Sequence, residues 1–228
     1  MILFDNAGVS ESTGEVATSF AAMAETAVDF ITALGLTQVD LLGWSIGGFV
    51  GQMVALNHPG LVPFLLKTAT NPTGAPKEVF DGFRAAVQAD RSQWNLDVTM
   101  PYYSFNRPGA KVSEGLRQDY WRQGQATGVL AAYHALGAFS ETDFRDDLQK
   151  ITVPALVVHG SDDQIVPLEI SATLTAKLIP QVKLVVYDGG SHGLLHVDDP
   201  RFARFQRLSI SIGRFFRPAL SCRVRDLA

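Results

Sequence analysis

The chain has 228 residues, of which 46% are hydrophobic and 18% are charged. That length suits one globular unit with a large core and room for an inserted lobe. The net charge of -4 provides no basic field to attract phosphates, which argues against nucleic acid as a partner. The single cysteine, Cys222, excludes an internal disulfide and a site of several thiolate ligands for a metal.

The first residues, MILFDNAG, have neither the basic start nor the long apolar run of a signal peptide. No stretch of the chain approaches the ~20 apolar residues of a membrane-spanning helix. We therefore expect a cytoplasmic protein that has no membrane partner. The sequence leaves its oligomeric state open.

Short apolar runs alternate with helical periodicity in the first part of the chain, a pattern typical of βαβ units around a parallel sheet. Met1 to Phe4 predicts a short strand. Apolar side chains at helical spacing from Val16 to Leu34 predict a helix, and Gly35 stands where such a helix would end. The pattern then predicts a buried strand at Val39 to Leu42, a helix at Ile46 to Asn57 and a strand at Leu61 to Leu66.

The pattern changes at about Asn71, and helical segments such as Val79 to Ala89 and Ser113 to Gly124 follow until Lys150. Most of the large polar aromatics fall in this part: Tyr102, Tyr103, Tyr120, Tyr133, Trp94 and Trp121. They form either the core of a helical subdomain or the lining of an apolar substrate pocket. We predict a core of residues 1–71 and 151–228 with a helical cap of residues 72–150.

Strands resume in the last third of the chain. Val153 to His159 is a nearly continuous apolar run, typical of a parallel strand covered on both faces. Pro167 favours the start of a helix, and Lys183 to Tyr187 predicts another strand. A final helix would carry Phe202, Phe205, Ile212 and Phe215 on one side, and we interpret its arginines as a solvated face.

The stretch LLGWSIGG places Ser45 between Gly43 and Gly47, where the predicted strand turns into the predicted helix. Such a corner exposes a serine hydroxyl above the sheet, and flanking glycines permit the close approach that the turn needs. The N–H of Ile46 would then face an oxyanion formed on Ser45. Ser45 could instead be a serine that only caps the helix, a position that serine favours.

A nucleophilic serine needs a base and an acid that orients the base. Among the histidines we prefer His192, in the glycine-rich loop DGGSHG after the last strand, with His196 in reserve. The other three are His58 at a helix end, His134 in the cap and His159 at a strand end. Asp162 and Asp163 follow a strand directly, although tandem carboxylates there are often only turn formers. The order serine, aspartate, histidine at strand ends matches one known architecture.

The chain resembles the α/β-hydrolase fold family along most of its length. FDNAGVSESTG resembles the turn after the family's fourth strand, with Ser10 where the family often has glycine. GWSIGG resembles its nucleophile elbow, VPALVVHGSDDQIVP its acid-bearing turn and GGSHGLL its histidine loop. In that turn the acid follows the glycine by three residues, so the resemblance selects Asp163 over Asp162. It implies an α/β fold with a mostly parallel sheet flanked by helices.

The cap segments NRPGAKVSEGLRQDYWRQG and AFSETDFRDDLQKITVP resemble bacterial cofactor-free haloperoxidases, better described as esterases and perhydrolases. This resemblance implies an acyl-serine intermediate that water or hydrogen peroxide resolves, with no metal or haem as cofactor. We expect a small apolar or aryl ester as substrate. Trp44, Tyr120 and Trp121 are the aromatic residues we expect to contact it.

The resemblance breaks at the start of the chain. The family has three further strands and a helix before the strand predicted at Met1 to Phe4, and a His-Gly loop that supplies a second oxyanion donor. Without the third strand, Met1 to Phe4 has no partner unless it shifts beside Val39 to Leu42 or frays. We expect either a truncated chain or a short variant. The alternative to an esterase is therefore a catalytically impaired fragment or a non-catalytic binding protein of the same fold.

Overall fold

The structure is a computed structural model that describes residues 2–68, 72–73, 76–110 and 112–194. Residues 1–197 form one compact unit, and residues 198–228 form a second that lies outside the described residues. The predicted final helix, His196 and Cys222 therefore fall outside the described part of the chain.

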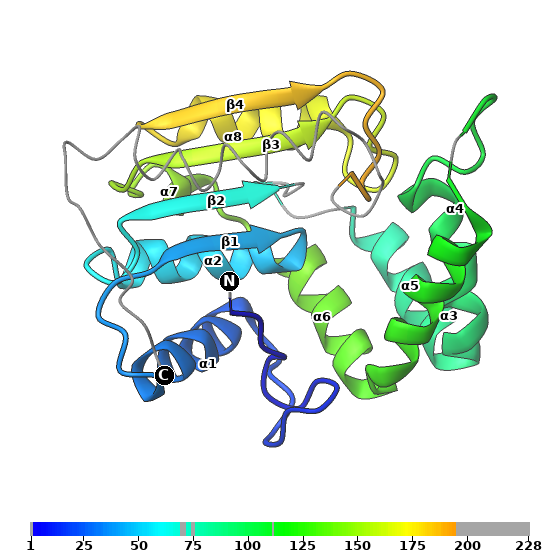
Figure 1. Cartoon of the computed structure of the whole chain (residues 1–228), viewed down its shortest axis with the longest axis horizontal. Helices are drawn as coiled ribbons and strands as arrows, with labels where there is room; N and C mark the ends of the chain where they lie inside the picture. Colours follow the sequence, from blue (N-terminus) through cyan, green and yellow to red (C-terminus); the bar gives the residue numbers. More distant parts are fainter. Residues whose placement is uncertain (1, 69–71, 74–75, 111, 195–228) are drawn as a thin grey trace, which may run out of the picture. The chain divides into compact units, whose positions relative to one another are not determined.

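Four strands form one parallel sheet: β1 (Asp40–Trp44), β2 (Phe64–Thr68), β3 (Ala155–Gly160) and β4 (Val182–Tyr187). Their order in the sheet is β1-β2-β3-β4, and each neighbouring pair is parallel. Because all four run in one direction, their carboxyl ends meet at the same edge. Figure 1 shows the arrowheads pointing toward the helices of the long insertion between β2 and β3. The parallel α/β class predicted from the sequence is confirmed.

The sheet is covered by helices that follow individual strands. α2 (Ile46–Asn57) packs against β1 and β2, and α8 (Ala172–Leu178) packs against β3 and β4. The short α7 (Arg145–Leu148) contacts both helices, and α1 (Phe20–Ala33) packs on α2. These helices α2, α7 and α8 lie behind the sheet in Figure 1.

α1 begins later than the apolar spacing predicted. Ser19 has extended backbone angles, and its Oγ accepts a hydrogen bond from the N–H of Ala22 at 3.2 Å. A serine in that position satisfies an N–H group that the first turn leaves unpaired, so the helix begins at Phe20 and not at Val16. Gly35 follows the end of the helix with a φ of 69°, as its place in the sequence predicted.

Of the described helices between β2 and β3, α7 packs with the helices of the sheet, and the others form the body of the insertion: α3 (Lys77–Asp97), α4 (Thr99–Tyr102), α5 (Glu114–Ala126) and α6 (Val129–Glu141). α3 packs against both α5 and α6. Asp90 interrupts α3 with a φ of -155° and a ψ of 91°, and its carboxylate accepts a hydrogen bond from the N–H of Gln93. The second half of α3 thus has its own cap. The division into core and cap at residues 72 and 150 stays a prediction.

An aromatic cluster joins the insertion to the helices of the sheet. Phe49 on α2 lies 4.8 Å from Phe20, 4.9 Å from Phe144 and 5.1 Å from Phe139 between ring centroids. Phe80 on α3 extends the stack, 4.7 Å from Phe139. All five rings are buried, so the cluster is one continuous apolar core rather than two separate ones.

The strand predicted at Met1 to Phe4 was wrong for the residues that the structure describes. Residues 2–4 have no strand assignment, and their side chains are 59%, 80% and 37% exposed. Phe4 instead stacks on Phe30 of α1, with ring centroids 4.5 Å apart. An apolar run signals burial but not a pairing partner. Among the described strands, none pairs with this segment.

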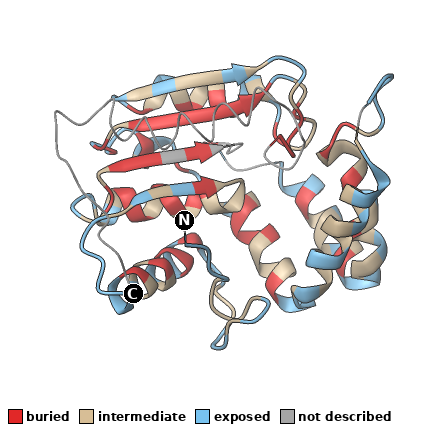
Figure 2. Ribbon diagram, viewed as in Figure 1, coloured by how far each residue is buried: buried red, intermediate tan, exposed pale blue. Residues whose placement is uncertain are grey.

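The strand predicted as buried at Val39 to Leu42 forms, as β1, but it is an edge strand. Among the described strands it pairs only with β2, and Leu42 is 46% exposed. Figure 2 shows β3 buried along its whole length, whereas β1 has both buried and exposed residues.

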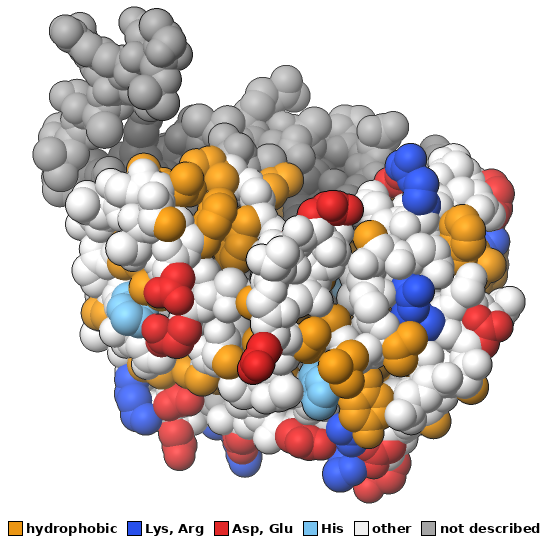
Figure 3. Space-filling model, turned by 90° about the horizontal axis from the view of Figure 1, so that it is seen from below, with side chains coloured by type: hydrophobic (Ala, Val, Ile, Leu, Met, Phe, Trp, Pro, Cys, Tyr) orange, Lys and Arg blue, Asp and Glu red, His pale blue; other side chains and the backbone are white. Residues whose placement is uncertain are grey.

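Figure 3 shows hydrophobic side chains together with charges of both signs on the face seen from below.

The other elements lie close to their predicted ranges. α2 has the predicted bounds, whereas β2 begins at Phe64 because the N–H groups of Leu61 and Val62 bond to the carbonyl of His58. The helix predicted after Pro167 is split into a 3₁₀ turn, η1 (Leu168–Ile170), and α8. Among the described residues, no helix is both long and apolar enough to cross a membrane.

Lys67 is a charged residue type in the middle of β2. Its side chain is fully buried, and its Nζ donates a hydrogen bond to the Gln52 side chain on α2. Burial lowers the pKa of Lys67 well below its usual value. The core therefore favours a neutral amine at this position.

Candidate active site

Ser45 occupies the corner between β1 and α2 in a strained backbone conformation, with φ 49° and ψ -118°. A positive φ is uncommon for a residue with a Cβ, and such strain persists only where the surrounding structure imposes it. The Ser45 side chain makes no capping hydrogen bond to α2. A serine present only to cap the helix would make that bond, so its hydroxyl is left for another purpose.

Gly43 explains how the chain can turn so sharply. A Cβ at Gly43 would lie 2.1 Å from the carbonyl oxygen of Gly47, which is too close for a side chain of any kind. Gly47 differs, because a Cβ built there would meet nothing within 4 Å. The expectation that both glycines permit a close approach is therefore correct for Gly43 and wrong for Gly47.

Asp163 and His192 are joined by a hydrogen bond, although 29 residues separate them. His192 Nδ1 lies 2.8 Å from Asp163 Oδ2, and both residues are buried. Because a carboxylate only accepts, the proton belongs on Nδ1 and the lone pair on Nε2. Asp163 Oδ1 accepts from the N–H groups of Ile165 and Val166, at 3.0 Å and 2.8 Å. The carboxylate is thus fixed on both oxygens.

Asp162, the other carboxylate of the tandem pair, turns toward the insertion. It accepts three hydrogen bonds from the Arg107 guanidinium, at 2.7 Å to 3.1 Å, and one from the Ser104 hydroxyl at 2.7 Å. The Arg107 hydrogen bonds hold the pKa of Asp162 below its usual value. Gln164 and Asn106 exchange reciprocal amide hydrogen bonds beside this pair. We call residues 102–107 the strap, because they bind the loop that carries Asp163.

Aromatic rings surround His192. Tyr102 of the strap lies 4.8 Å from the His192 ring, and Trp44, which precedes Ser45, lies 6.4 Å from it. Tyr102 and Trp44 stack on each other with centroids 6.3 Å apart, and Tyr120 of α5 contacts Tyr102 at 4.8 Å. Burial raises the pKa of Tyr120 to about 12, so its phenol stays neutral. Trp44 and Tyr120 thus lie in one aromatic wall beside the histidine.

Gly193 lets this wall approach the histidine loop. Its N–H donates to the carbonyl of Tyr102 at 2.8 Å. A Cβ at Gly193 would lie 2.3 Å from the Tyr103 ring and 3.0 Å from that of Tyr102. Only glycine fits here without displacing the rings.

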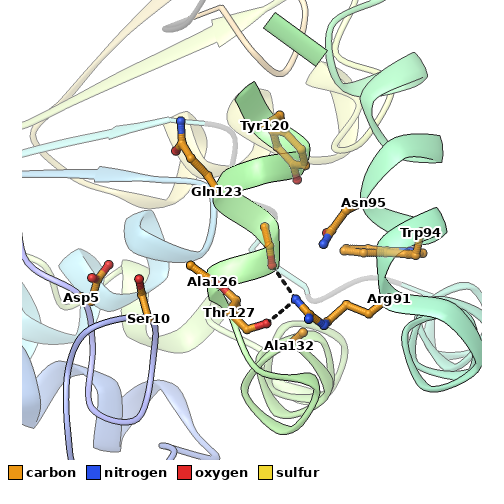
Figure 4. A pocket seen from close by; sticks show the side chains of 11 residues that line it. Asp5, Ser10, Arg91, Trp94, Asn95, Tyr120, Gln123, Ala126, Thr127 and Ala132 are labelled. Atoms are coloured by element: carbon orange, nitrogen blue, oxygen red, sulfur yellow. Dashed lines mark hydrogen bonds between the residues drawn. The ribbon is translucent and has the colours of Figure 1, made fainter. Parts of the chain in front are cut away.

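A cavity of about 450 Å³ is lined in part by Tyr120 of the same wall. Figure 4 shows Arg91, Trp94 and Asn95 entering it from α3 and Tyr120 from α5. Arg91 Nη1 donates to three carbonyls at the end of α5, those of Gly124, Gln125 and Thr127. The three residues expected to react do not line it; Tyr120 alone connects this space, through Tyr102, to His192.

The remaining predicted residues lie in different surroundings. Ile46 is the first residue of α2, where backbone N–H groups have no partner within the helix. Trp121 donates its indole N–H to Ser92 of α3 at 2.9 Å, so that group is used inside the insertion. His58 pairs with Glu25 at 3.5 Å, and His134 contacts the Tyr133 ring at 5.7 Å. Neither of these two belongs to the Asp163–His192 pair.

The sequence missed two residues of this site. Tyr102 was assigned to the cap aromatics without a role, and His159 was set aside as a strand end. His159 is fully buried, and its Nε2 lies 3.4 Å from the same Asp163 oxygen that binds His192. No local signal identifies either residue. Tyr102 and His192 are distant in sequence, and the four-residue spacing of His159 and Asp163 does not show that their side chains approach each other. Within the described ranges, no group of three or more His, Cys, Asp and Glu side chains could hold a metal ion.

Comparison with known proteins agrees with this fold. The family profile described as alpha/beta hydrolase fold matches residues 1–199. The chain belongs to the α/β-hydrolase fold family. The esterase from Exiguobacterium antarcticum superposes with a TM-score of 0.81 at 25% identity, over 92% of this chain and 80% of the esterase. The bromoperoxidase from Bacillus anthracis, at 24% identity over 91% of this chain and 80% of that protein, shares the fold with a TM-score of 0.81.

Two curated relatives in this α/β-hydrolase family are more similar in sequence. The non-heme haloperoxidase of Rhodococcus erythropolis is 46% identical over 74% of this chain and 66% of its own length. The bifunctional esterase/perhydrolase of Acinetobacter calcoaceticus is 50% identical over 58% of this chain and 48% of its own. The chain thus spans about half to two thirds of the length of these relatives. The predicted resemblance to the haloperoxidase group is confirmed.

Proposed function

We propose that this protein is a serine hydrolase that cleaves small carboxylic esters through an acyl-serine intermediate. The observation that carries the proposal is the Asp163–His192 hydrogen bond at the same edge of the sheet as a strained Ser45 whose hydroxyl does not cap α2. An acid, a base and an available nucleophile at the carboxyl edge of one sheet are the parts that acyl transfer requires. The esterase/perhydrolase name of the Acinetobacter calcoaceticus relative supports the same chemistry.

In this mechanism Ser45 Oγ attacks the ester carbonyl while His192 Nε2 takes the hydroxyl proton. Asp163 holds the ring in the tautomer that leaves Nε2 free, and it stabilises the imidazolium that forms. The Ile46 N–H donates to the oxyanion of the tetrahedral intermediate. Collapse of that intermediate expels the alcohol, which receives the proton from His192. Water then attacks the acyl-serine in the same way and releases the carboxylic acid.

The walls of the site favour an apolar or aryl ester. Trp44, Tyr102 and Tyr120 present ring faces and edges near His192. Burial raises the pKa of Tyr102 well above its usual value, so the ring presents no charge to the substrate. Trp121 stays a predicted substrate contact. Its contribution would come from its ring, because its N–H is bound to Ser92.

Steady-state and burst kinetics with p-nitrophenyl acetate test the proposal, together with labelling by a fluorophosphonate. We expect a burst of nitrophenol, a label on Ser45, and loss of both in Ser45→Ala. Absence of burst and label in a folded preparation contradicts the proposal. Hydrogen peroxide in place of water would attack the acyl-serine to give a peracid and free serine. Bromide oxidation should therefore need acetate as well as peroxide, and oxidation without any carboxylate would exclude the perhydrolase route.

The alternative is a catalytically impaired fragment or a non-catalytic binding protein of the same fold. It is favoured by the single oxyanion donor, Ile46, that we can assign among the described residues. A cooperative unfolding transition that an ester analogue shifts, without any turnover that depends on Ser45, would support this alternative. Robust esterase activity that Ser45→Ala abolishes would exclude it.

A further inference from the structure

A second imidazole lies behind the Asp163–His192 pair. His159 is the penultimate residue of β3 and is fully buried. Its Nε2 lies 2.8 Å from the carbonyl oxygen of Val166 and 3.4 Å from Asp163 Oδ2. The Ser171 hydroxyl, before α8, lies 3.4 Å from the same nitrogen. One ring edge therefore contacts the acid, the loop after the acid and the start of the next helix.

These contacts determine which nitrogen carries the proton. A carbonyl oxygen only accepts, so His159 Nε2 bears the hydrogen and donates it to Val166, while Asp163 Oδ2 lies 3.4 Å from the same nitrogen. Nδ1 is then an acceptor, and among the described residues it is buried without a hydrogen-bond partner. An apolar ring of similar size would avoid burying an unpaired nitrogen. The polar ring is therefore not explained by packing, and the useful group is its Nε2–H.

His159 is held neutral by its surroundings. Burial lowers its pKa, His192 and Lys67 act in the same direction, and the Asp163 carboxylate and the Val166 carbonyl oppose them. A charged imidazole at this place would compete with His192 for Asp163 Oδ2. A neutral imidazole offers that oxygen only the positive end of an N–H dipole.

We propose that His159 is a positioning residue for Asp163: its Nε2–H holds the Val166 carbonyl, and with it the loop whose N–H groups bind Asp163, so that Asp163 faces His192. The proposal rests on the proposed function, in which Asp163 orients His192. A carboxylate that no longer faces His192 stabilises the protonated imidazole less. Loss of the His159 Nε2–H should therefore make His192 less basic.

The test is an NMR titration of the His192 imidazole in a Ser45→Ala background, which needs no activity. We expect His159→Phe, which keeps a ring but has no donor, to lower the midpoint of the His192 titration by about 0.5–1 unit. His159→Gln restores an amide donor and should return the midpoint toward that of the parent. Val157→Ala on the same strand is the matched control, because it opens a buried space without removing the hydrogen bond to Val166, and it should leave the midpoint unchanged.

In the chain with Ser45 intact, we expect His159→Phe to lower kcat about 10- to 100-fold with little change in KM, because misplacement of the acid acts on the reacting geometry. The acid limb of the pH profile should move to lower pH, which a merely destabilising substitution would not cause. His159→Gln should recover most of the rate.

A folded His159→Phe variant whose His192 midpoint is unchanged or higher overturns the proposal. If that variant does not fold, His159→Asn replaces it, since the shorter amide does not extend as far toward Val166 and Asp163. Equal midpoints for the Asn and Gln variants would then overturn it. Failure of the esterase assay alone counts against the proposed function and leaves the titration readable.

Discussion

The strain at Ser45 predicts an unusual ranking of two inactive variants. Ser45→Gly and Ser45→Ala both remove the hydroxyl, so neither should turn over an ester. They differ in backbone freedom, because at φ 49° and ψ -118° a Cβ is unfavourable and glycine is not. We therefore expect Ser45→Gly to be the more stable of the two. In most structured positions alanine is the more stable.

The magnitude follows from two opposing terms. A residue held in a sparsely populated region costs about 1–3 kcal/mol. Glycine gains back that strain but loses about 0.5–1 kcal/mol through the larger entropy of the unfolded chain. The net advantage of Ser45→Gly over Ser45→Ala is about 1 kcal/mol. For a chain of this size that corresponds to a rise of about 2–4 °C in Tm.

Thermal unfolding followed by circular dichroism measures the difference, provided that the transition is cooperative and reversible. Ser140 in α6 supplies the matched control, because its hydroxyl bonds to the Gly137 carbonyl within a helix. There the glycine variant should be the less stable by about 1 kcal/mol. If the Ser140 pair behaves so and Ser45→Gly still melts no higher than Ser45→Ala, the backbone at Ser45 is not strained and the reasoning is refuted.

Three further predictions concern neighbouring features. Asp163→Asn should lower kcat on p-nitrophenyl acetate by about 10⁴-fold because it allows the wrong His192 tautomer. Asp162→Asn should lower kcat less than about tenfold, since its partner Arg107 is largely exposed. Equal losses would contradict the assignment of the acid. Gly193→Ala should displace the Tyr103 ring, destabilise the fold by about 1–3 kcal/mol and reduce turnover, as measured by unfolding and kinetics; an unperturbed Tm would show that the rings yield freely. Because the pKa of Lys67 is lowered in the folded chain, the unfolded chain binds one more proton between that lowered value and ~10.4. The free energy of unfolding should therefore rise with pH by up to about 1.36 kcal/mol per pH unit in this window. Lys67→Met should remove that pH dependence in denaturant titrations, and an unchanged pH dependence would assign it to another group.

Local signals were sufficient for the parts of the site that depend on neighbouring residues. Ser45 was recognisable because a strand, a glycine and a helix follow one another within a few positions, and α2 has the predicted bounds. β3 is an apolar run that the sheet buries on both faces, so its period and length agree with its environment. Ser19 shows a limit of apolar periodicity as a signal, since a single capping side chain sets the start of α1 later than the periodicity predicts.

Contacts between distant segments could not be read in this way. Whether β1 is an edge or a central strand depends on a neighbour, and its own residues do not encode that neighbour. Tyr102 reaches His192 only because the insertion folds back over the carboxyl edge of the sheet. His159 was ambiguous for a different reason. Its Nε2 lies 3.4 Å from Asp163, only four residues later, but that spacing does not show that the two side chains point toward each other.

The tandem carboxylates have a mechanical consequence. Asp162 binds Ser104 and Arg107 of the strap, and Asp163 binds His192. Gly193, which follows His192 in the chain, donates its N–H back to Tyr102 of the strap. These links form a closed circuit that passes through three separate segments. In a closed circuit, rupture of one link leaves the ends held by the others, so the three segments should move as one body. We expect the Gly193 N–H to exchange its hydrogen as slowly as the centre of β3, and fast exchange would show an open circuit. Admission of an ester would then depend on motion elsewhere in the insertion.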